Sequence, residues 1–344
     1  MKSLTLKVDP KPISPKVLFV EEYREVVKHL RIQLQDANYL IITDESVHRH
    51  STAFFDYFEA DKVVTLPAGE NIKQWDSVKH MLDQCFQHHL DRNSYLIAVG
   101  GGVITDAVGF AASIFLRGIN FVQIPTSLLC MVDAALGGKT GMNCEWGKNL
   151  IGSFHHPKLI LMARDFLQTL PEKEIQNGLS EMIKHGVITS KKHFTDLESL
   201  ATPHPKTVLN DIWKLVPDSI QIKKQVVESD PFEGRERMKL NLGHTFGHAL
   251  ERLTDMRMPH GQAVAIGTII AADYAVKKGL CSQTTANRIR KIFVNFGMDL
   301  EHKFTFEQIW KAMGTDKKRE GDYINLILPR SIGEVDIVKE KYVK

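Results

Sequence analysis

The sequence predicts an α/β domain over residues 1–165, followed by a mostly helical domain over residues 166–344. In the first half, short apolar runs alternate with longer segments whose apolar residues recur at helical spacing. In the second half, helical patterns dominate and one pair of extended runs appears. Alternating strands and helices form parallel sheets that bind ligands at the carboxyl ends of the strands. The cleft between the two domains is therefore the expected active site.

The individual elements follow from these patterns in chain order. The expected strands of the first half are the apolar runs 17–20, 38–43, 62–66, 94–100 and 120–125. The helices expected among them cover 71–90 and 106–116. From about Phe166 onward the expected helices are 173–189, 206–229, 241–255, 261–279 and 284–296. The extended pair covers 323–329 and 334–338.

Composition narrows the class of protein. The 344 residues are 43% hydrophobic and 25% charged, as in a globular protein of two domains. The 44 basic and 41 acidic residues are dispersed, which argues against a nucleic-acid or membrane-surface partner. The four cysteines have no paired spacing, which indicates a reducing compartment. Without an apolar leader or a membrane-spanning run, a cytoplasmic location is expected.

Two glycine-rich stretches suggest phosphate binding. The segment "DAALGGKTG" (133–141) resembles a P-loop, but Asp133 stands where the first glycine of that motif is needed, so ATP is not the expected ligand. Gly100, Gly101 and Gly102 lie between a strand and a helix, where backbone N–H groups can approach phosphate. Thr105 interrupts the dinucleotide fingerprint, so a nucleotide loop and a plain tight turn fit this run equally.

Three segments of the second half carry candidate metal ligands. Glu181 lies three residues before Lys184, on the same helix face, and His260 precedes an apolar helix. His244 and His248 share a helix face at i,i+4, so spacing alone favours this pair as ligands. A glutamate and two histidines form a typical catalytic zinc site with one open position. The alternative, purely structural interpretation is that these histidines are hydrogen-bonded core or surface residues.

Nine stretches follow one another in order between about residues 69 and 318: "GGGVITDAVGF", "FLRGINFVQIPTSLL", "VDAALGGKTGMN", "GKNLIGSFHHPK", "NGLSEMIKHG", "IKKQVVESD", "NLGHTFGHALE", "HGQAVAIG" and "DKK". Together they resemble the 3-dehydroquinate synthases, which are NAD-dependent sugar phosphate cyclases. The resemblance implies a Rossmann-like NAD-binding domain, a helical metal- and substrate-binding domain, and a homodimer. It also implies a zinc ion, or cobalt in its place, and a small sugar phosphate as substrate.

The resemblance also implies roles for single residues. It assigns the metal to Glu181, His244 and His260, and so overrules the spacing argument by placing His248 with the substrate. The implied substrate pocket comprises Asp133, Lys139, Asn149, Lys184, Lys223, Glu233, Arg237, Asn241, His248 and Lys317, together with Arg117 from the partner subunit. The implied NAD contacts are Asp44, Glu70, Lys73, Gly101, Gly102, Val103, Asp106, Thr126, Ser127, Lys139, Lys148, Phe166 and Thr169.

The implied reaction converts 3-deoxy-D-arabino-heptulosonate 7-phosphate to 3-dehydroquinate through transient oxidation by NAD, loss of phosphate, re-reduction and aldol closure. Lys223 and Arg237 suit the substrate carboxylate, which argues against related valiolone or inosose synthases. Two competing hypotheses are a metal-dependent polyol dehydrogenase and a non-catalytic protein that binds metal or nucleotide. Three positions depart from the family pattern: Ser180, "AAL" at 134–136, and Gln262, where loss of a carboxylate could weaken support of a metal ligand.

Overall fold

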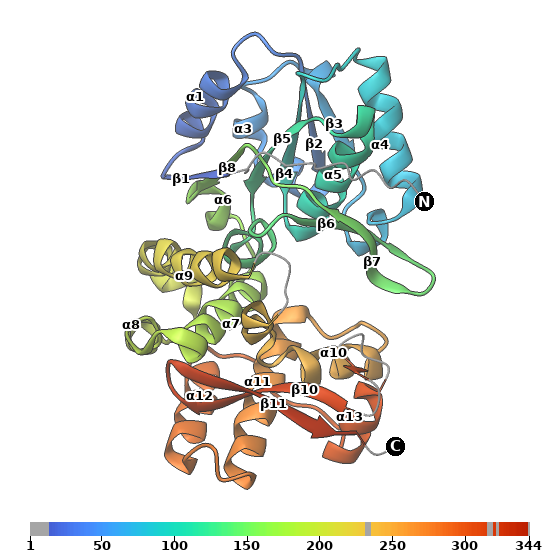
Figure 1. Ribbon diagram of the computed structural model, residues 1–344. Helices are drawn as coiled ribbons and strands as arrows, with labels where there is room; N and C mark the ends of the chain where they lie inside the picture. Colours follow the sequence, from blue (N-terminus) through green and yellow to red (C-terminus); the bar gives the residue numbers. More distant parts are fainter. Residues whose placement is uncertain (1–13, 231–234, 315–318, 321–322, 343–344) are drawn as a thin grey trace, which may run out of the picture.

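A computed structural model describes residues 14–230, 235–314, 319–320 and 323–342. Its first half is built on a six-stranded parallel sheet with the strand order β1-β8-β5-β4-β2-β3 (Figure 1). These strands are β1 (Lys16–Val20), β2 (Tyr39–Asp44), β3 (Val63–Leu66), β4 (Tyr95–Gly100), β5 (Asn120–Pro125) and β8 (Leu159–Ala163). The five strands expected from the sequence are confirmed to within about one residue. The expected set omits β8, whose five residues are all buried.

Helices cover both faces of this sheet. They are α1 (Tyr23–Leu34), α2 (Glu45–His50), α3 (Thr52–Phe55), α4 (Trp75–Gln87), α5 (Gly102–Ile114) and α6 (Asp165–Gln168). Successive residues of a strand point to opposite faces, so Ile41 packs in the core with α1, α3 and α6, whereas Leu40 and Ile42 pack with α4 and α5. Between β5 and β8 the chain forms an antiparallel hairpin of β6 (Lys139–Cys144) and β7 (Gly147–Phe154).

The second half is mostly helical, as expected. Its helices are α7 (Glu172–Thr189), α8 (Lys191–Leu200), α9 (Leu209–Ser229), α10 (His244–Leu253), α11 (His260–Lys277), α12 (Gln283–Asn295) and α13 (Phe306–Met313). A small antiparallel sheet has the order β11-β10-β9 and consists of β9 (Arg319–Glu320), β10 (Tyr323–Ser331) and β11 (Glu334–Lys341). Among the described residues, none of the helices combines the length and apolarity needed to cross a bilayer.

Helix α7 decides where the site lies. It packs against α8, α9 and α11, so thirteen of its eighteen residues are buried, polar ones included. One apolar core runs from the α1 face of the sheet through α7 into the C-terminal helices. Figure 1 shows α7 and α9 between the upper sheet and the lower helices. Charged groups on α7 are therefore held between the two halves of the chain.

Candidate functional site

A buried acidic group at the centre of α7 begins the site. Glu181 is fully buried, and Lys184, one turn later, contacts its Oε2 atom and is also buried. Neither carboxylate oxygen of Glu181 accepts a well-formed hydrogen bond from the described residues. A buried carboxylate is strongly destabilising unless it is paired or bound to a metal. Glu181 therefore has the character of a ligand that is only partly satisfied by protein groups.

Two histidines from different helices converge on this carboxylate. The Nε2 atom of His244 lies 3.5 Å from Glu181 Oε1, and Nε2 of His260 lies 3.7 Å from the same oxygen. One ligand atom from each of the three residues lies within 4.8 Å of the others. This trio contains the ligand types and number of a catalytic zinc site.

The helix starts explain how two residues sixteen positions apart in the sequence meet. His244 and His260 are the first residues of α10 and α11. Gly243, which precedes α10, has φ +78°, and a Cβ atom there would lie 2.7 Å from the carbonyl oxygen of Val264 on α11. Only glycine combines this conformation with such a close helix contact. The close packing brings the beginnings of both helices over α7.

Each histidine is oriented by its other ring nitrogen. His244 Nδ1 lies 3.2 Å from the carbonyl oxygen of Leu242, and His260 Nδ1 lies 3.1 Å from Glu251 Oε1. Burial by itself lowers the pKa of His260, but the carboxylates of Glu181 and Glu251 raise it to about 10 in the metal-free protein. The imidazole rings thus turn Nε2 toward Glu181.

His248, the other member of the pair favoured by spacing, is placed differently. Its ring is 5.4 Å from that of His244 and 6.2 Å from that of His260, measured between centroids. It can share a metal-sized group with Glu251 and His260, whereas Glu181 groups with His244 and His260 and, in a second set, with Asp133 and His185. Of the pair favoured by i,i+4 spacing, only His244 belongs to the trio of Glu181, His244 and His260.

Buried cations lie near the group formed by Glu181, His244 and His260. Lys223 on α9 is buried, and its Nζ atom lies 2.5 Å from both the backbone oxygen and Oδ1 of Asp133. Burial alone would raise the pKa of Asp133, but Lys223 and Lys184 hold it well below its usual range. Arg237 is buried too, and its Nη2 atom donates to the carbonyl oxygen of Gly137 at 3.4 Å. Three cations therefore approach the "DAALGGKTG" segment and α7.

The remaining substrate candidates lie around this cluster or beyond the described chain. Lys139 begins β6, Asn241 ends the short helical segment Glu236–Asn241, and Asn149 on β7 has φ +55° and donates its N–H to Asn143. Arg117 follows α5 at φ +68°. Glu233 and Lys317 lie outside the described residues.

The glycine run forms a cradle at the carboxyl ends of β4 and β5. Gly101 precedes α5, and a Cβ atom on it would lie 3.5 Å from Ser127 Oγ. A Cβ atom on Gly102 would lie 3.2 Å from the Cβ of Ala134. No side chain caps the start of α5 within the described structure. The exposed N–H groups of this helix start suit a phosphate, which favours the nucleotide reading over the plain turn.

A second charged pair lies beside this cradle. The Nζ atom of buried Lys73 donates to Asp106 Oδ2 at 2.5 Å. Burial raises the pKa of Asp106, although the ammonium of Lys73 opposes this. Asn143, which sequence reasoning missed, accepts Asn149 N–H and donates to Glu70 Oε1 at 2.8 Å. The β6–β7 hairpin is thereby fastened to the expected cofactor loop.

The other cofactor candidates are more scattered. Asp44 ends β2 and caps α2 by accepting from two backbone N–H groups. Thr126 follows β5, Val103 lies in the first turn of α5, and Lys148 is on β7. Thr169 caps the end of α6, and the Phe166 ring is buried against Tyr23 and Phe54. Phe166 can therefore offer a ligand little more than its backbone.

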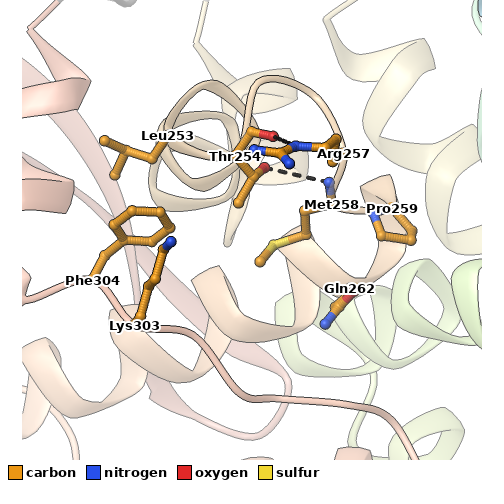
Figure 2. A pocket seen from close by; sticks show the side chains of 8 residues that line it. All are labelled: Leu253, Thr254, Arg257, Met258, Pro259, Gln262, Lys303 and Phe304. Carbon is orange, nitrogen blue, oxygen red and sulfur yellow. Dashed lines mark hydrogen bonds between the residues drawn. The ribbon is translucent and has the colours of Figure 1, made fainter.

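A separate pocket of about 350 Å³ lies on the outer side of the α10–α11 turn. Figure 2 shows its lining residues: Leu253, Thr254, Arg257, Met258, Pro259, Gln262, Lys303 and Phe304. None of the site residues expected from the sequence lines it. Gln262, one of the three departures, thus faces this pocket. Ser180, another departure, donates to the carbonyl oxygen of Gln176 within α7.

Comparisons with known proteins bear on the family of the chain. A family model described as 3-dehydroquinate synthase N-terminal matches residues 63–177, and one described as 3-dehydroquinate synthase C-terminal matches residues 178–319. A 3-dehydroquinate synthase of Dictyoglomus thermophilum is 38% identical over 336 residues, covering 91% of this chain and 95% of that protein. One from Helicobacter pylori is 43% identical and covers 80% of both chains.

Two solved structures share the fold. A 2-epi-5-epi-valiolone synthase from Streptomyces hygroscopicus, with NAD+ and Zn2+ bound, is 25% identical with a TM-score of 0.86, covering 98% of this chain and 95% of that one. A 2-deoxy-scyllo-inosose synthase complexed with carbaglucose-6-phosphate, NAD+ and Co2+ is 23% identical with a TM-score of 0.83, covering 94% and 93%. The second likeness concerns the fold alone.

Proposed function

The chain belongs to the 3-dehydroquinate synthase family and is a lyase of that activity, and we propose that Glu181, His244 and His260 hold its catalytic metal ion. The observation that carries this proposal is that one ligand atom from each of these residues lies within 4.8 Å of the other two. The carboxylate of Glu181 also lacks well-formed hydrogen bonds from the described residues. Zn2+ and Co2+ both suit two imidazoles and one carboxylate. The donor set therefore fits the ions found in the two solved structures.

NAD fits the cradle at the start of α5. Gly101 and Gly102 leave the backbone open to a pyrophosphate, and the uncapped helix start favours its negative charge. Ser127 lies beside this turn, and the Lys73–Asp106 pair supports the loop next to it. These contacts favour a dinucleotide at the carboxyl edge of the sheet, as in other open α/β folds.

The buried cations suit a substrate with two anionic ends. Arg237 offers a planar fork that matches a carboxylate, and Lys223 and Lys184 supply two further buried, compact charges. We assign the substrate phosphate to Lys139, which begins β6. This set favours 3-deoxy-D-arabino-heptulosonate 7-phosphate over the carboxylate-free substrates of related cyclases.

The chemistry divides between the cofactors and the chain. When bound, NAD supplies a reversible oxidation of a substrate hydroxyl, and the metal ion supplies Lewis acidity at that hydroxyl. The residues of the chain bind and orient: Arg237 and Lys223 fix the carboxylate, and Asp133 accepts a hydrogen bond from a hydroxyl. The substrate phosphate can itself accept the proton lost before elimination, so no separate basic residue is needed. The product enters the shikimate pathway of aromatic amino acid biosynthesis.

One assay tests this function. The protein is mixed with NAD, Zn2+ and the heptulosonate phosphate, while inorganic phosphate, NADH and 3-dehydroquinate are followed. Phosphate release that matches product, without net NADH, is expected. Accumulation of NADH would indicate a dehydrogenase. If neither phosphate nor NADH forms, the result would indicate a binding protein. Arg237→Ala should harm the carboxylate-bearing substrate selectively, and equal loss on a decarboxy analogue would contradict its assignment.

We further propose that two chains form a homodimer through the β6–β7 hairpin. Its apolar side chains Trp146, Leu150, Ile151 and Phe154 are exposed, and Trp146 is 82% exposed. Ser153 Oγ donates to Ser113 Oγ on α5 at 2.8 Å, so the hairpin contacts the C-terminal end of α5, which is followed by Arg117. A partner covering this surface brings Arg117 near the other chain.

Subunit mixing tests the shared site. Arg117→Ala and Lys184→Ala are each expected to be inactive. If Arg117 serves the partner's site, mixing the two variants restores part of the activity, because each hybrid dimer contains one intact site. No recovery in a mixture that sediments as a dimer would place Arg117 in its own chain's site. We also propose that residues 1–165 and 166–344 are the two domains and that the enzyme works in the cytoplasm.

A further inference from the structure

Glu251 is a buried carboxylate that the sequence motifs did not single out. It lies on α10 three residues after His248 and seven after His244, so the three side chains share one helix face. It is buried, and a buried carboxylate requires a partner. Its partner is His260, whose Nδ1 atom lies 3.1 Å from Glu251 Oε1.

This contact fixes the form of the His260 ring. An ionised carboxylate only accepts hydrogen bonds, so Nδ1 carries a proton, and Nε2 is the nitrogen whose proton a metal ion would displace. The Nε2 atom lies on the side of Glu181, 3.7 Å from its Oε1 atom. His244 reaches the same state through the neutral carbonyl of Leu242. The orienting group of His260 is thus a charged carboxylate.

The turn between Glu251 and His260 is held by several hydrogen bonds. Met256 N–H donates to the carbonyl of Glu251 at 2.7 Å, and Met258 N–H donates to Thr254 Oγ1 at 3.3 Å. Asp255 and Met256 both have positive φ values, of 51° and 61°. Such strained backbone persists only where the surroundings hold it. The turn therefore sets the position of His260 relative to Glu251.

We propose that Glu251 is a positioning residue for the metal site: its carboxylate holds His260 as the Nδ1–H tautomer, with Nε2 toward the metal, and strengthens this nitrogen as a ligand. The inference rests on the metal site proposed above. It also bears on the departure at Gln262, because that side chain lines the outer pocket shown in Figure 2. The carboxylate that supports His260 comes from α10 instead.

Metal affinity tests this role without an activity measurement. Glu251→Gln keeps an oxygen that can accept from Nδ1 but removes the charge, whereas Glu251→Ala removes both. Zn2+ is titrated into each metal-free variant in competition with a chromophoric chelator, and the Co2+ absorption spectrum is recorded. Glu301→Gln, an exposed change of the same type, is the matched control. Glu181→Gln reports on the metal site itself.

The variants are expected to differ in their affinity for Zn2+. Glu251→Gln should bind Zn2+ about 10-fold more weakly than the unmodified chain and Glu251→Ala up to about 100-fold more weakly, with an altered Co2+ spectrum. Glu301→Gln should bind normally. If Glu181→Gln abolishes binding while both Glu251 variants bind normally, the role of Glu251 is overturned. If Glu181→Gln binds normally, the proposed metal site fails instead.

Folding is checked by circular dichroism and thermal unfolding of each metal-free variant. Weaker binding by a Glu251→Gln variant that melts like the unmodified protein supports the proposal. If that variant does not fold, Glu251→Asp replaces it, since the shorter side chain keeps the charge but withdraws from His260. Normal Zn2+ affinity of the Asp variant then overturns the proposal, and weakened affinity supports it.

Discussion

The ion pair between buried Lys223 and partly buried Asp133 should couple the two halves of the chain energetically. Lys223 comes from α9 in the helical half, whereas Asp133 follows the last strand before the hairpin in the sheet half. The ammonium lies 2.5 Å from two oxygens of Asp133. Replacing Lys223 with methionine keeps most of the side-chain volume and leaves the partly buried carboxylate of Asp133 without its nearest cation.

The structure sets the size of the effect. Breaking a fully buried ion pair by removing one partner costs about 3–5 kcal/mol. Because the Asp133 side chain is 27% exposed and partly screened by water, Lys223→Met should lower the free energy of unfolding by about 2–4 kcal/mol. Asp133→Asn should cost less, about 1–3 kcal/mol, because Lys223 keeps the backbone carbonyl and an amide oxygen as acceptors. The double variant should be more stable than the sum of the single losses predicts.

The assay is urea unfolding of the metal-free variants, followed by circular dichroism. Lys224→Met is the matched control, because Lys224 is the next residue on α9 and makes an exposed ion pair with Glu228. Exposed pairs contribute at most about 1 kcal/mol. The reasoning is refuted if Lys223→Met is no more destabilising than Lys224→Met. Additive losses of Lys223→Met and Asp133→Asn, within about 0.5 kcal/mol, would also refute it.

Three further outcomes are expected. Gly137→Ala should raise KM about 10-fold or more, because φ is +95° there and a Cβ atom would overlap the Arg237 guanidinium. Gly279→Ala is the control: it also has a positive φ but open space around it, so KM should stay unchanged. Equal KM values for the two variants would contradict this prediction. Burial lowers the pKa of His193 to about 4, so its neutral form stabilises the fold fully above about pH 6.5, and this contribution of about 3 kcal/mol is lost as the pH falls toward 4. His193→Leu should flatten the dependence of Tm on pH in that range, and an unchanged slope would exclude the assignment. Removal of metal by a chelator should stop phosphate release and lower Tm, with Zn2+ or Co2+ restoring both, and activity that survives complete removal would count against the metal proposal.

Much of the fold could be predicted because its signals are local. The first-half strands are short apolar runs between amphipathic helices, and this periodicity identifies them without tertiary information. The strand β8 was missed because five apolar residues, 159–163, carry no alternation that separates a buried strand from other buried segments. The helix α1 was also not among the named elements, although its apolar residues have helical spacing.

The candidate site shows a clearer division. The types of its residues, and the ordered motifs that contain them, were visible in the sequence, and they indicated a metal, a nucleotide and an anionic substrate. Spacing within one helix paired His244 with His248, because i,i+4 neighbours are the only contacts that a single helix reveals. The choice of His260 depends on the close approach of α10 and α11 at Gly243.

The sequence by itself determined the chemistry that is present in this chain, and the tertiary structure decided which groups share one place. Glu181 is 63 residues before His244, and Arg237 is 100 residues after Gly137, so no periodicity links the members of either pair. Burial gives these contacts their meaning: the same glutamate on a solvated helix would carry no information, whereas packing on all sides of α7 removes water from Glu181. The carboxylate of Glu251 became visible as a partner of His260 for the same reason.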